Sequence, residues 1–215
     1  STLVYHFISD RCCRNNYILN LANPGYAGQA YYAYAPPPTT VNNTPVFAVA
    51  PVPFICNTDT ASVLNQAFDS DGDSLAYSFV TPYNGISSNM NPNPNPPVNY
   101  QWTIPNVGYA GTYSLAAPFG PGGYAAIDAT TGLSYYYAPN QGFYVVAVEI
   151  REYRNGQLIG ISRRDIQIIV ISCPVNPAPA LSSSTAQTSF IIEEGDTLCF
   201  NTTFNDANGD SIFIT

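Results

Sequence analysis

Residues 143–158 read Phe-Tyr-Val-Val-Ala-Val-Glu-Ile-Arg-Glu-Tyr-Arg-Asn-Gly-Gln-Leu, and this stretch decides the fold. Apolar side chains recur with a period of two, which predicts a half-buried strand with Glu149 and Arg151 on its solvated face. Asn155-Gly156 is the strongest short signal for a tight hairpin, because both residues tolerate positive φ. The return strand ends in residues 166–171, whose nearly continuous apolar sequence predicts burial on both faces.

Shorter segments with strand-forming residues precede this hairpin, and turn-forming residues separate them. The 19 prolines and 15 glycines disfavour long helices, because proline removes a backbone donor and clashes with the preceding turn. About nine or ten short strands predict an all-β fold of the β-sandwich type, with a β-barrel as the alternative. The other strand candidates are Leu3–Ile8, Gln29–Ala35, Val46–Ala48, Val63–Phe68, Leu75–Val80, Tyr124–Ile127 and Leu133–Tyr137.

The charge balance excludes several classes of partner. The formal charge is −8, and all six basic residues are arginine. An acidic chain repels phosphate backbones, so we expect neither nucleic-acid binding nor a polybasic membrane contact. No stretch approaches the roughly 20 apolar residues of a membrane span, so we expect a chain that is not membrane-spanning. Any targeting signal is expected to have been removed or to lie outside this sequence.

Two segments interrupt the strand pattern. Residues 89–97 alternate Asn with Pro and predict an exposed, extended loop. Residues 174–187 are rich in Pro and Ser, a composition typical of a linker. We therefore expect one β-sandwich domain over residues 1–173, a linker over residues 174–187, and the first strands of a second, truncated domain over residues 188–215.

An internal repeat supports this division. Asp69-Ser70-Asp71-Gly72-Asp73-Ser74-Leu75 follows a segment that contains Cys56. Asp206-Ala207-Asn208-Gly209-Asp210-Ser211-Ile212 follows a segment that contains Cys199. The same order of cysteine, Asp-rich turn and apolar residue in both places predicts two copies of one domain type.

Both Asp-rich turns are candidate calcium sites. Oxygen-bearing side chains stand at alternate positions, and hard oxygen ligands on a turn are what Ca²⁺ prefers. The spacing does not match an EF-hand. The alternative is an ordinary solvated turn, since Asp, Asn and Gly favour turns without any metal. The candidate ligands are Asp69, Asp71 and Asp73 in the first turn, and Asp206, Asn208 and Asp210 in the second.

The chain has five cysteines, Cys12, Cys13, Cys56, Cys173 and Cys199. A zinc site is disfavoured, because there is no C-x-x-C pair and a single histidine. We expect Cys12 and Cys13 to pair with Cys56 and Cys173 in either order, and Cys199 to find its partner outside this sequence. Buried free thiols in a cytosolic protein are the alternative.

Catalytic arrangements are nearly absent. One histidine and no G-x-S-x-G motif argue against the common hydrolase triad. Glycoside hydrolysis would need two carboxylates at a set separation, and the candidates are Glu149, Glu152, Asp128 and Asp165. Glu149 and Glu152 are spaced to face opposite sides of one strand, so we predict no catalytic residues and no enzymatic activity.

Aromatic clusters could instead form a stacking platform for sugars. The clusters are Tyr31-Tyr32-Ala33-Tyr34, Tyr100 with Trp102, and Tyr135-Tyr136-Tyr137. Trp102 and Tyr100 are the candidate ligand-binding residues. Because one side of each strand in a sandwich faces the core, core packing or an interface with a neighbouring subunit is the alternative for these aromatic residues.

Three motifs together resemble a known family. They are residues 11–16, Arg-Cys-Cys-Arg-Asn-Asn, the turn at residues 69–75, and residues 152–167 around Asn155-Gly156. They resemble the tandem Ig-like or cadherin-like domains of large Bacteroidota surface proteins, the gliding-motility-associated adhesins exported by the type 9 secretion system. The resemblance implies an Ig-like or cadherin-like β-sandwich in an extracellular repeat protein.

The resemblance also implies a structural or adhesive role at the cell surface or in a filament, with neighbouring repeats, other copies of the chain, or surface glycans as partners. Bacteroidota O-glycosylation resembles an Asp-(Ser/Thr)-apolar pattern, which marks Thr60, Ser74, Thr197 and Ser211 as candidate glycosylation sites. The rival functions are a carbohydrate-binding module that uses exposed Tyr and Trp, and a filament subunit that assembles by strand exchange.

Overall fold

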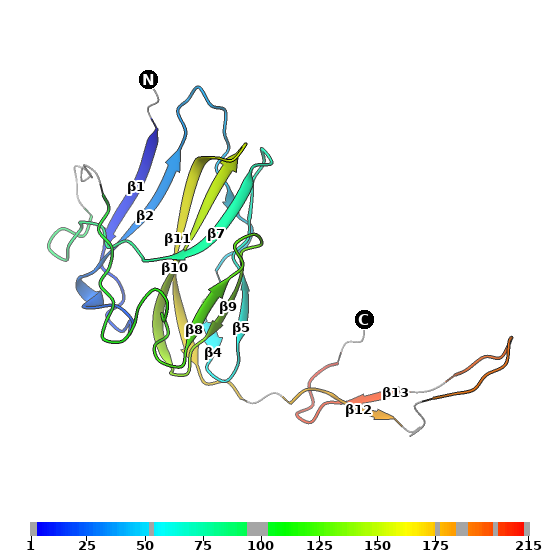
Figure 1. Cartoon of the computed structure of the whole chain (residues 1–215). Coiled ribbons are helices and arrows are strands. Elements are labelled where there is room, and N and C mark those ends of the chain that lie inside the picture. Colours follow the sequence, from blue (N-terminus) through cyan, green and yellow to red (C-terminus); the bar gives the residue numbers. More distant parts are fainter. Residues whose placement is uncertain are drawn as a thin grey trace. The chain divides into compact units, whose positions relative to one another are not determined.

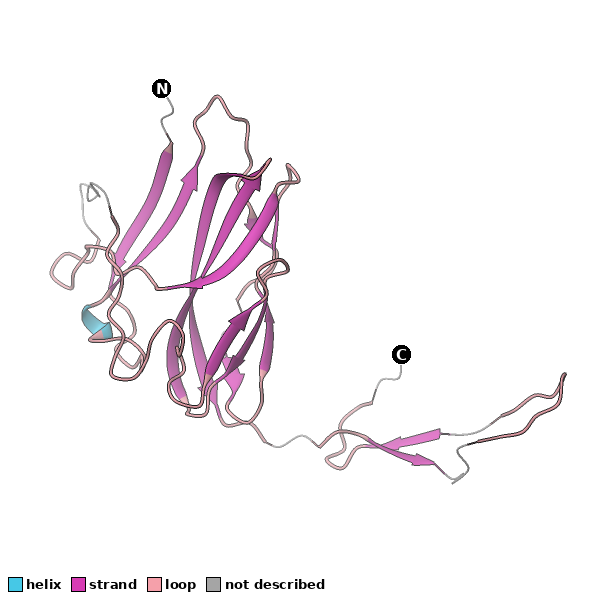
Figure 2. Cartoon of the chain, in the orientation of Figure 1, coloured by secondary structure: helices cyan, strands magenta, loops and turns pink. Residues whose placement is uncertain are grey.

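The computed structural model describes residues 4–51, 54–93, 103–174, 177–183, 189–199 and 202–212. The chain divides into two compact units, Ser1–Cys173 (unit 1) and Pro174–Thr215 (unit 2). Strands dominate unit 1, where the short 3₁₀ helix η1, Pro24–Tyr26, stands out in Figure 2, and the described part of unit 2 contains one pair of short strands. Within the described ranges, no helix has the length and apolar character needed to cross a membrane.

The larger sheet of unit 1 has the strand order β1-β2-β11-β10-β7, and all these neighbours are antiparallel (Figure 1). A further strand, β4, pairs in parallel with the end of β11. The strands are β1 Tyr5–Cys12, β2 Gly28–Ala35, β4 Phe54–Cys56, β7 Ser74–Val80, β10 Gly142–Arg154 and β11 Gln157–Ile171.

A second layer packs against one face of this sheet. It consists of a three-stranded sheet of order β5-β9-β8 and a two-stranded sheet of β3 and β6. The main core lies between the layers, where Tyr136 and Phe119 contact the inner face of β10 and β11. The prediction of an all-β sandwich is confirmed. The strands of this layer are β3 Val46–Phe47, β5 Ala61–Leu64, β6 Ala67–Phe68, β8 Tyr124–Ile127 and β9 Leu133–Tyr137.

The predicted hairpin is present as β10 and β11. Its turn is Asn155-Gly156, with φ of 51° and 76°, which is the left-handed region that these two residues adopt at low cost. Arg154 pairs with Gln157 across the turn, and the ladder continues to Gly142 and Val170. This register aligns the two longest strands of the unit.

Burial along the hairpin differs from the prediction. β10 is buried on both faces: its inner face packs on the second layer, while Val145 on the outer face packs against Ile18, Leu21 and Val107. These loop residues cover β10 from outside. The end of β11 lacks such a cover at Gln167 and Ile171, which are exposed, so the prediction of two buried faces there is wrong.

The predicted strand Val63–Phe68 is two strands that belong to different sheets. β5 pairs with β9, whereas β6 pairs with β3. Between them Asn65 is fully buried, and its side-chain amide donates to the Ser134 and Tyr136 hydroxyls. This polar link satisfies a buried amide and lets the chain change sheets within two residues.

The disulfides also differ from the predicted pairing. Cys56 bonds to Cys173 across 117 residues of sequence, and Cys12 bonds to its neighbour Cys13. Because β4 pairs with the end of β11, Cys56 and Cys173 come together with a Cα–Cα distance of 5.4 Å. β2 separates β1 from β11, so the expected bonds from Cys12 and Cys13 to that pair are wrong.

In unit 2, β12 (Ala180–Ser183) and β13 (Thr202–Asn205) form an antiparallel pair. β12 lies inside the segment predicted to be a linker, so residues 180–183 correct that prediction. Cys199 is an exposed free thiol. The described part of the predicted loop at residues 89–97 is exposed over residues 89–93, and the rest lies outside the described residues.

The long-range disulfide is expected to contribute strongly to the stability of unit 1. Closing a loop of about 117 residues restricts the unfolded chain, so the double variant Cys56→Ser/Cys173→Ser should lose about 4 to 5 kcal/mol of unfolding free energy. Denaturant unfolding measures this, with Cys199→Ser as the control that should leave stability unchanged. An unaltered midpoint in the double variant would contradict the pairing.

Candidate metal centre

The first Asp-rich turn is organised by Asp69. Its Oδ1 accepts hydrogen bonds from the backbone N–H groups of Asp71 and Asp73, at 2.9 and 3.0 Å. Gly72 supplies the positive φ of 79° that the turn requires. The turn connects β6 to β7, so it places Asp73 directly before the start of β7.

Asp71 does not take part in the predicted centre. Its carboxylate accepts hydrogen bonds from the backbone N–H and the side-chain amide of Asn43, at 2.6 and 2.7 Å. These bonds lower the pKa of Asp71 below its ordinary value. Asp71 therefore holds the loop before β3 in place, and the prediction that it shares a metal centre with Asp69 and Asp73 is wrong.

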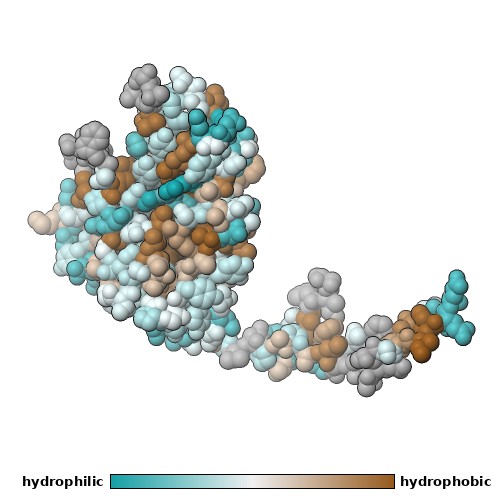
Figure 3. All heavy atoms as spheres, in the orientation of Figure 1, coloured by the Kyte–Doolittle hydropathy of each residue, from teal (hydrophilic) through white to brown (hydrophobic). Residues whose placement is uncertain are grey.

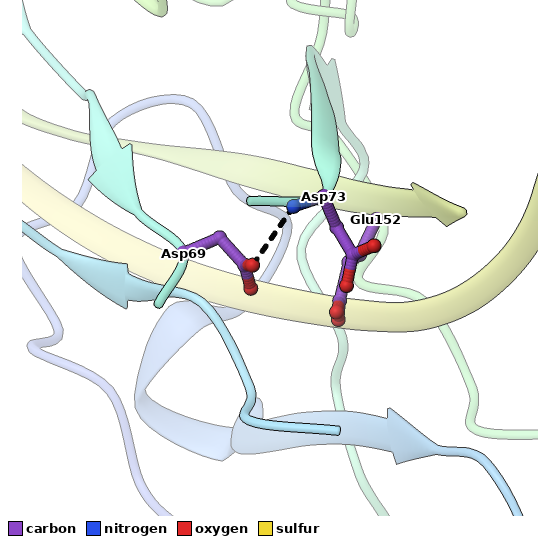
Figure 4. Close-up of side chains that lie close together, drawn as sticks. All are labelled: Asp69, Asp73 and Glu152. Carbon is purple, nitrogen blue, oxygen red and sulfur yellow. Dashed lines mark hydrogen bonds between the residues drawn. The ribbon is translucent and has the colours of Figure 1, made fainter. Parts of the chain in front are cut away.

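Glu152 takes the third position instead. Oxygens of Asp69, Asp73 and Glu152 all lie within 4.8 Å of one another, and Figure 4 shows the three carboxylates converging on one space. Glu152 lies on β10, where it pairs with Leu75 at the start of β7. Across the hairpin, Gly160 leaves room for the carboxylate, because a Cβ there would overlap it.

Arg154 neutralises part of this acidic cluster. Its Nε donates to Asp73 Oδ1 at 2.7 Å, and its Nη2 donates to Asp73 Oδ2 at 2.5 Å and to Asp71 Oδ2 at 3.3 Å. The bidentate contact lowers the pKa of Asp73 and raises that of Arg154. Asp73 is thus ionised and fixed in orientation, while Asp69 and Glu152 have no arginine partner of their own in these contacts.

Glu152 is 1% exposed, and neither of its oxygens, nor Asp69 Oδ2, has a hydrogen bond of normal geometry. Burial, followed by the nearby Asp73 and Asp69 carboxylates, raises the pKa of Glu152 to about 7, although the Asn42 amide lies close enough to oppose this. Buried carboxylate oxygens without donors need a proton or a cation. A proton on Glu152 or a cation between the carboxylates would each satisfy these oxygens, which makes the cluster a candidate metal centre.

The second Asp-rich turn repeats the backbone geometry of the first. Asp206 Oδ1 accepts the N–H groups of Asn208 and Asp210, at 3.1 and 3.0 Å, and Gly209 has φ of 82°. The Asn208 amide donates to Asp210 Oδ2. Among the described residues, however, the only group of three close acidic or metal-binding side chains is the one in unit 1.

The other carboxylates considered for catalysis are held by structural partners. Glu149 is 1% exposed, accepting from Arg151 at 2.7 Å and Arg163 at 2.6 Å, so the prediction of a solvated face is wrong for Glu149, whereas Arg151 is exposed. Asp165 pairs with the buried Arg14 at 2.6 Å. The geometry offers none of these groups to a substrate.

Asp128 is also engaged. Its Oδ1 accepts the backbone N–H groups of Thr130 and Thr131 as well as the Thr131 hydroxyl. These bonds lower the pKa of Asp128 and fix the turn between β8 and β9. It is a turn residue, placed by the same kind of side-chain contact as Asp69.

The tyrosines divide between core and surface. Tyr136 is buried in the main core, whereas Tyr135 on the same strand faces outward, as the alternation of a strand requires. Beside it, the Tyr124 and Tyr137 rings lie 6.0 Å apart with planes at 37°, so this pair is not coplanar. Trp102 and Tyr100 lie outside the described residues.

The candidate glycosylation sites are accessible. Thr60, Ser74, Thr197 and Ser211 are all exposed. Thr60 Oγ1 lies 2.9 Å from the Tyr124 hydroxyl, while Ser74 is the first residue of β7 beside the acidic cluster. Exposure permits modification at each position without opening the fold.

Comparison with known proteins yields no relative: no family model matches the chain, and no match is found among curated proteins or solved structures.

The raised pKa of Glu152 predicts a pH-dependent stability. A carboxyl that binds its proton more tightly when folded stabilises the fold fully below its ordinary pKa of 4.5, and this contribution is lost as pH rises through about 7. We expect the unfolding midpoint of the metal-free chain to fall between about pH 5 and pH 8. Glu152→Gln should remove most of that fall, since an amide cannot ionise.

Thermal unfolding in the presence of a chelator measures this dependence. The pKa values of Asp71 and Asp73 are lowered, so these two carboxyls titrate only in more acidic solution. They do not contribute to the change in stability between about pH 5 and pH 8. Glu193→Gln, at an exposed position of unit 2, is the matched control and should keep the slope. Equal slopes in wild type and Glu152→Gln would show that Glu152 does not titrate in this range.

Proposed function

We propose that this chain is a non-enzymatic structural or adhesive module of a long extracellular protein built from tandem Ig-like domains. The observation that carries the proposal is the repeated turn: Asp69 and Asp206 accept the same two backbone N–H groups, at positions two and four residues later. Two turns with identical bonding, one in each compact unit, support descent from one repeated domain.

The disulfides support an extracellular location. Structural disulfides persist in oxidising compartments and are rare in the cytosol. The two disulfides leave Cys199 as a free, exposed thiol. The resemblance noted in the sequence extends this proposal to a Bacteroidota surface protein exported by the type 9 system, with O-glycans on exposed Thr60 or Ser74.

The role proposed for unit 1 is mechanical. Of the four carboxylates considered for hydrolysis, Glu149, Asp165 and Asp128 are tied to arginines or to a turn, which supports the absence of catalysis. The Cys56–Cys173 bond joins β4 to the segment after β11, and thereby encloses β5 to β11 in a covalent loop, while β1, β2 and β3 lie outside it. A pulled chain therefore lengthens only outside that loop. Neighbouring repeats and other copies of the chain are its proposed partners.

Single-molecule pulling tests this role. In the oxidised chain, the residues between Cys56 and Cys173 should stay hidden from the applied force. Reduction should release about 117 residues, or about 40 nm of additional contour length. Cys199→Ser, pulled in the same way, should behave as wild type. Equal extension before and after reduction would remove the mechanical proposal.

We also propose that Ca²⁺ binds to Asp69, Asp73 and Glu152. Asp69 Oδ2 and both Glu152 oxygens are buried without hydrogen bonds of normal geometry, and oxygen ligands of this type suit calcium. A cation there would link the β6–β7 turn to β10, which stiffens the end of the sandwich. The arginine contact leaves the cluster with net negative charge, which the cation would offset.

Calcium should therefore raise the unfolding midpoint, because a ligand that binds only the folded state stabilises it. Isothermal titration should find one site per chain, since the cluster is complete only in unit 1 among the described residues. Glu152→Gln should abolish both effects, and Asp210→Asn in the second turn should leave both intact. An unchanged midpoint with saturating calcium would overturn the metal proposal.

A further inference from the structure

The β-pairing of unit 2 matches one pairing of unit 1. In unit 1, β3 and β6 are antiparallel with Val46 opposite Phe68. In unit 2, β12 and β13 are antiparallel with Leu181 opposite Phe204. Phe68 stands directly before the first Asp-rich turn, and Phe204 stands one residue further before the second. β12 and β13 thus correspond to β3 and β6.

The segments between these paired strands also agree. In unit 1, Phe54-Ile55 and then Asp59-Thr60 lie between β3 and β6. In unit 2, Phe190-Ile191 and then Asp196-Thr197 lie between β12 and β13. The order of strand, Phe-Ile, Asp-Thr, strand and Asp-rich turn is the same in both units. The correspondence therefore begins at β3, and the hairpin of β1 and β2 precedes it.

Corresponding isoleucines have opposite environments. Ile55 is 4% exposed, because β4 pairs in parallel with the end of β11 and Ile55 lies opposite Val170. Ile191 is fully exposed and Ile192 is about half exposed. Figure 3 shows hydrophobic residues gathered beside the hydrophilic tip of unit 2. A large apolar side chain in full contact with water indicates a surface that another segment covers.

We infer that residues 190–192 are a docking strand, the counterpart of β4, whose occupant is a parallel strand of the β11 type from the same second repeat. This inference rests on the proposed tandem-repeat function and adds the register and the partner. In unit 1, the occupant is the segment Ile169–Ile171, so the partner of Ile191 is an apolar strand that closes its own domain. Main-chain pairing and burial of Ile191 supply the affinity.

A second copy of the chain does not fit as the occupant. The matching edge of its β11 is already paired with β4, and the Cys56–Cys173 bond keeps β4 there. Exchange of this strand between copies would require that disulfide to break. The structure therefore favours completion of unit 2 within its own repeat over strand exchange between chains.

The test completes unit 2 with the strands of unit 1. The starting chain carries Cys199→Ser. A copy of residues 76–173 is attached directly after Ile212, because Ile212 follows the second Asp-rich turn as Leu75 follows the first. We expect a second protease-resistant domain and a second cooperative unfolding transition. Ile191→Asp should destroy this second transition in the extended chain, yet leave the unfolding of the original chain unchanged because Ile191 is exposed there.

Disulfide formation tests the register independently of stability. Matching Phe54-Ile55 with Phe190-Ile191 places Ile192 at the position of Cys56, so Ile192→Cys in the extended chain should bond to the second Cys173. Glu193→Cys, the position that the spacing from Asp59-Thr60 to Asp196-Thr197 would give instead, should not. Selective formation of the first bond supports the docking strand even where the second domain is only marginally stable. Equal trapping of both variants, or of neither, would overturn the inference.

These outcomes are separate from those of the proposed function. Failure of the extended chain would overturn the docking strand, while the pulling experiment on unit 1 alone decides the mechanical role. Detection of dimers linked through Ile192→Cys of one chain and Cys173 of another would instead establish exchange between copies and contradict completion within one repeat.

Discussion

β10 is buried on both faces, and the rest of unit 1 is arranged to make this burial possible. One face packs on the β5-β9-β8 sheet, and the other is covered by the segments that carry Ile18, Leu21 and Val107. Arg151 on this strand is exposed, but a charged side chain that is buried there requires a partner within the protein. β10 nevertheless carries two glutamates.

The two glutamates meet this requirement in different ways. Glu149 lies between Arg151 and Arg163, and Arg163 in turn stacks on the Tyr83 ring at 3.9 Å. A buried carboxylate with two arginines is a satisfied structural element. Glu152 faces two aspartates instead, so like charges meet where opposite charges would stabilise the fold. That difference separates a structural carboxylate from a candidate ligand on the same strand.

The sequence predicted local features well and distant ones poorly. Asn155-Gly156 predicted the hairpin because turn chemistry acts within a few residues, and β8 and β9 were predicted with their observed bounds. Glu152 was not expected beside Asp69, since their contact depends on the register between β7 and β10. The Cys56–Cys173 bond likewise follows from the parallel pairing of β4 with β11, which no local pattern shows.

The two units differ in structure because only unit 1 contains the distant strands that complete a sandwich. Unit 1 buries its β4 because β10 and β11 follow it in the chain and supply both a partner strand and a core. Unit 2 has a single pair of four-residue strands in its described part, and such a pair is marginally stable alone. The Asp206 turn still adopts the geometry of the Asp69 turn, because its bonds span four residues and need no core. Local structure is therefore complete in unit 2, whereas the acidic cluster and the burial of the Phe-Ile strand need strands that fold against it. The two proposed functions, cation binding and mechanical resistance, therefore both require the completed sandwich and not its turns alone.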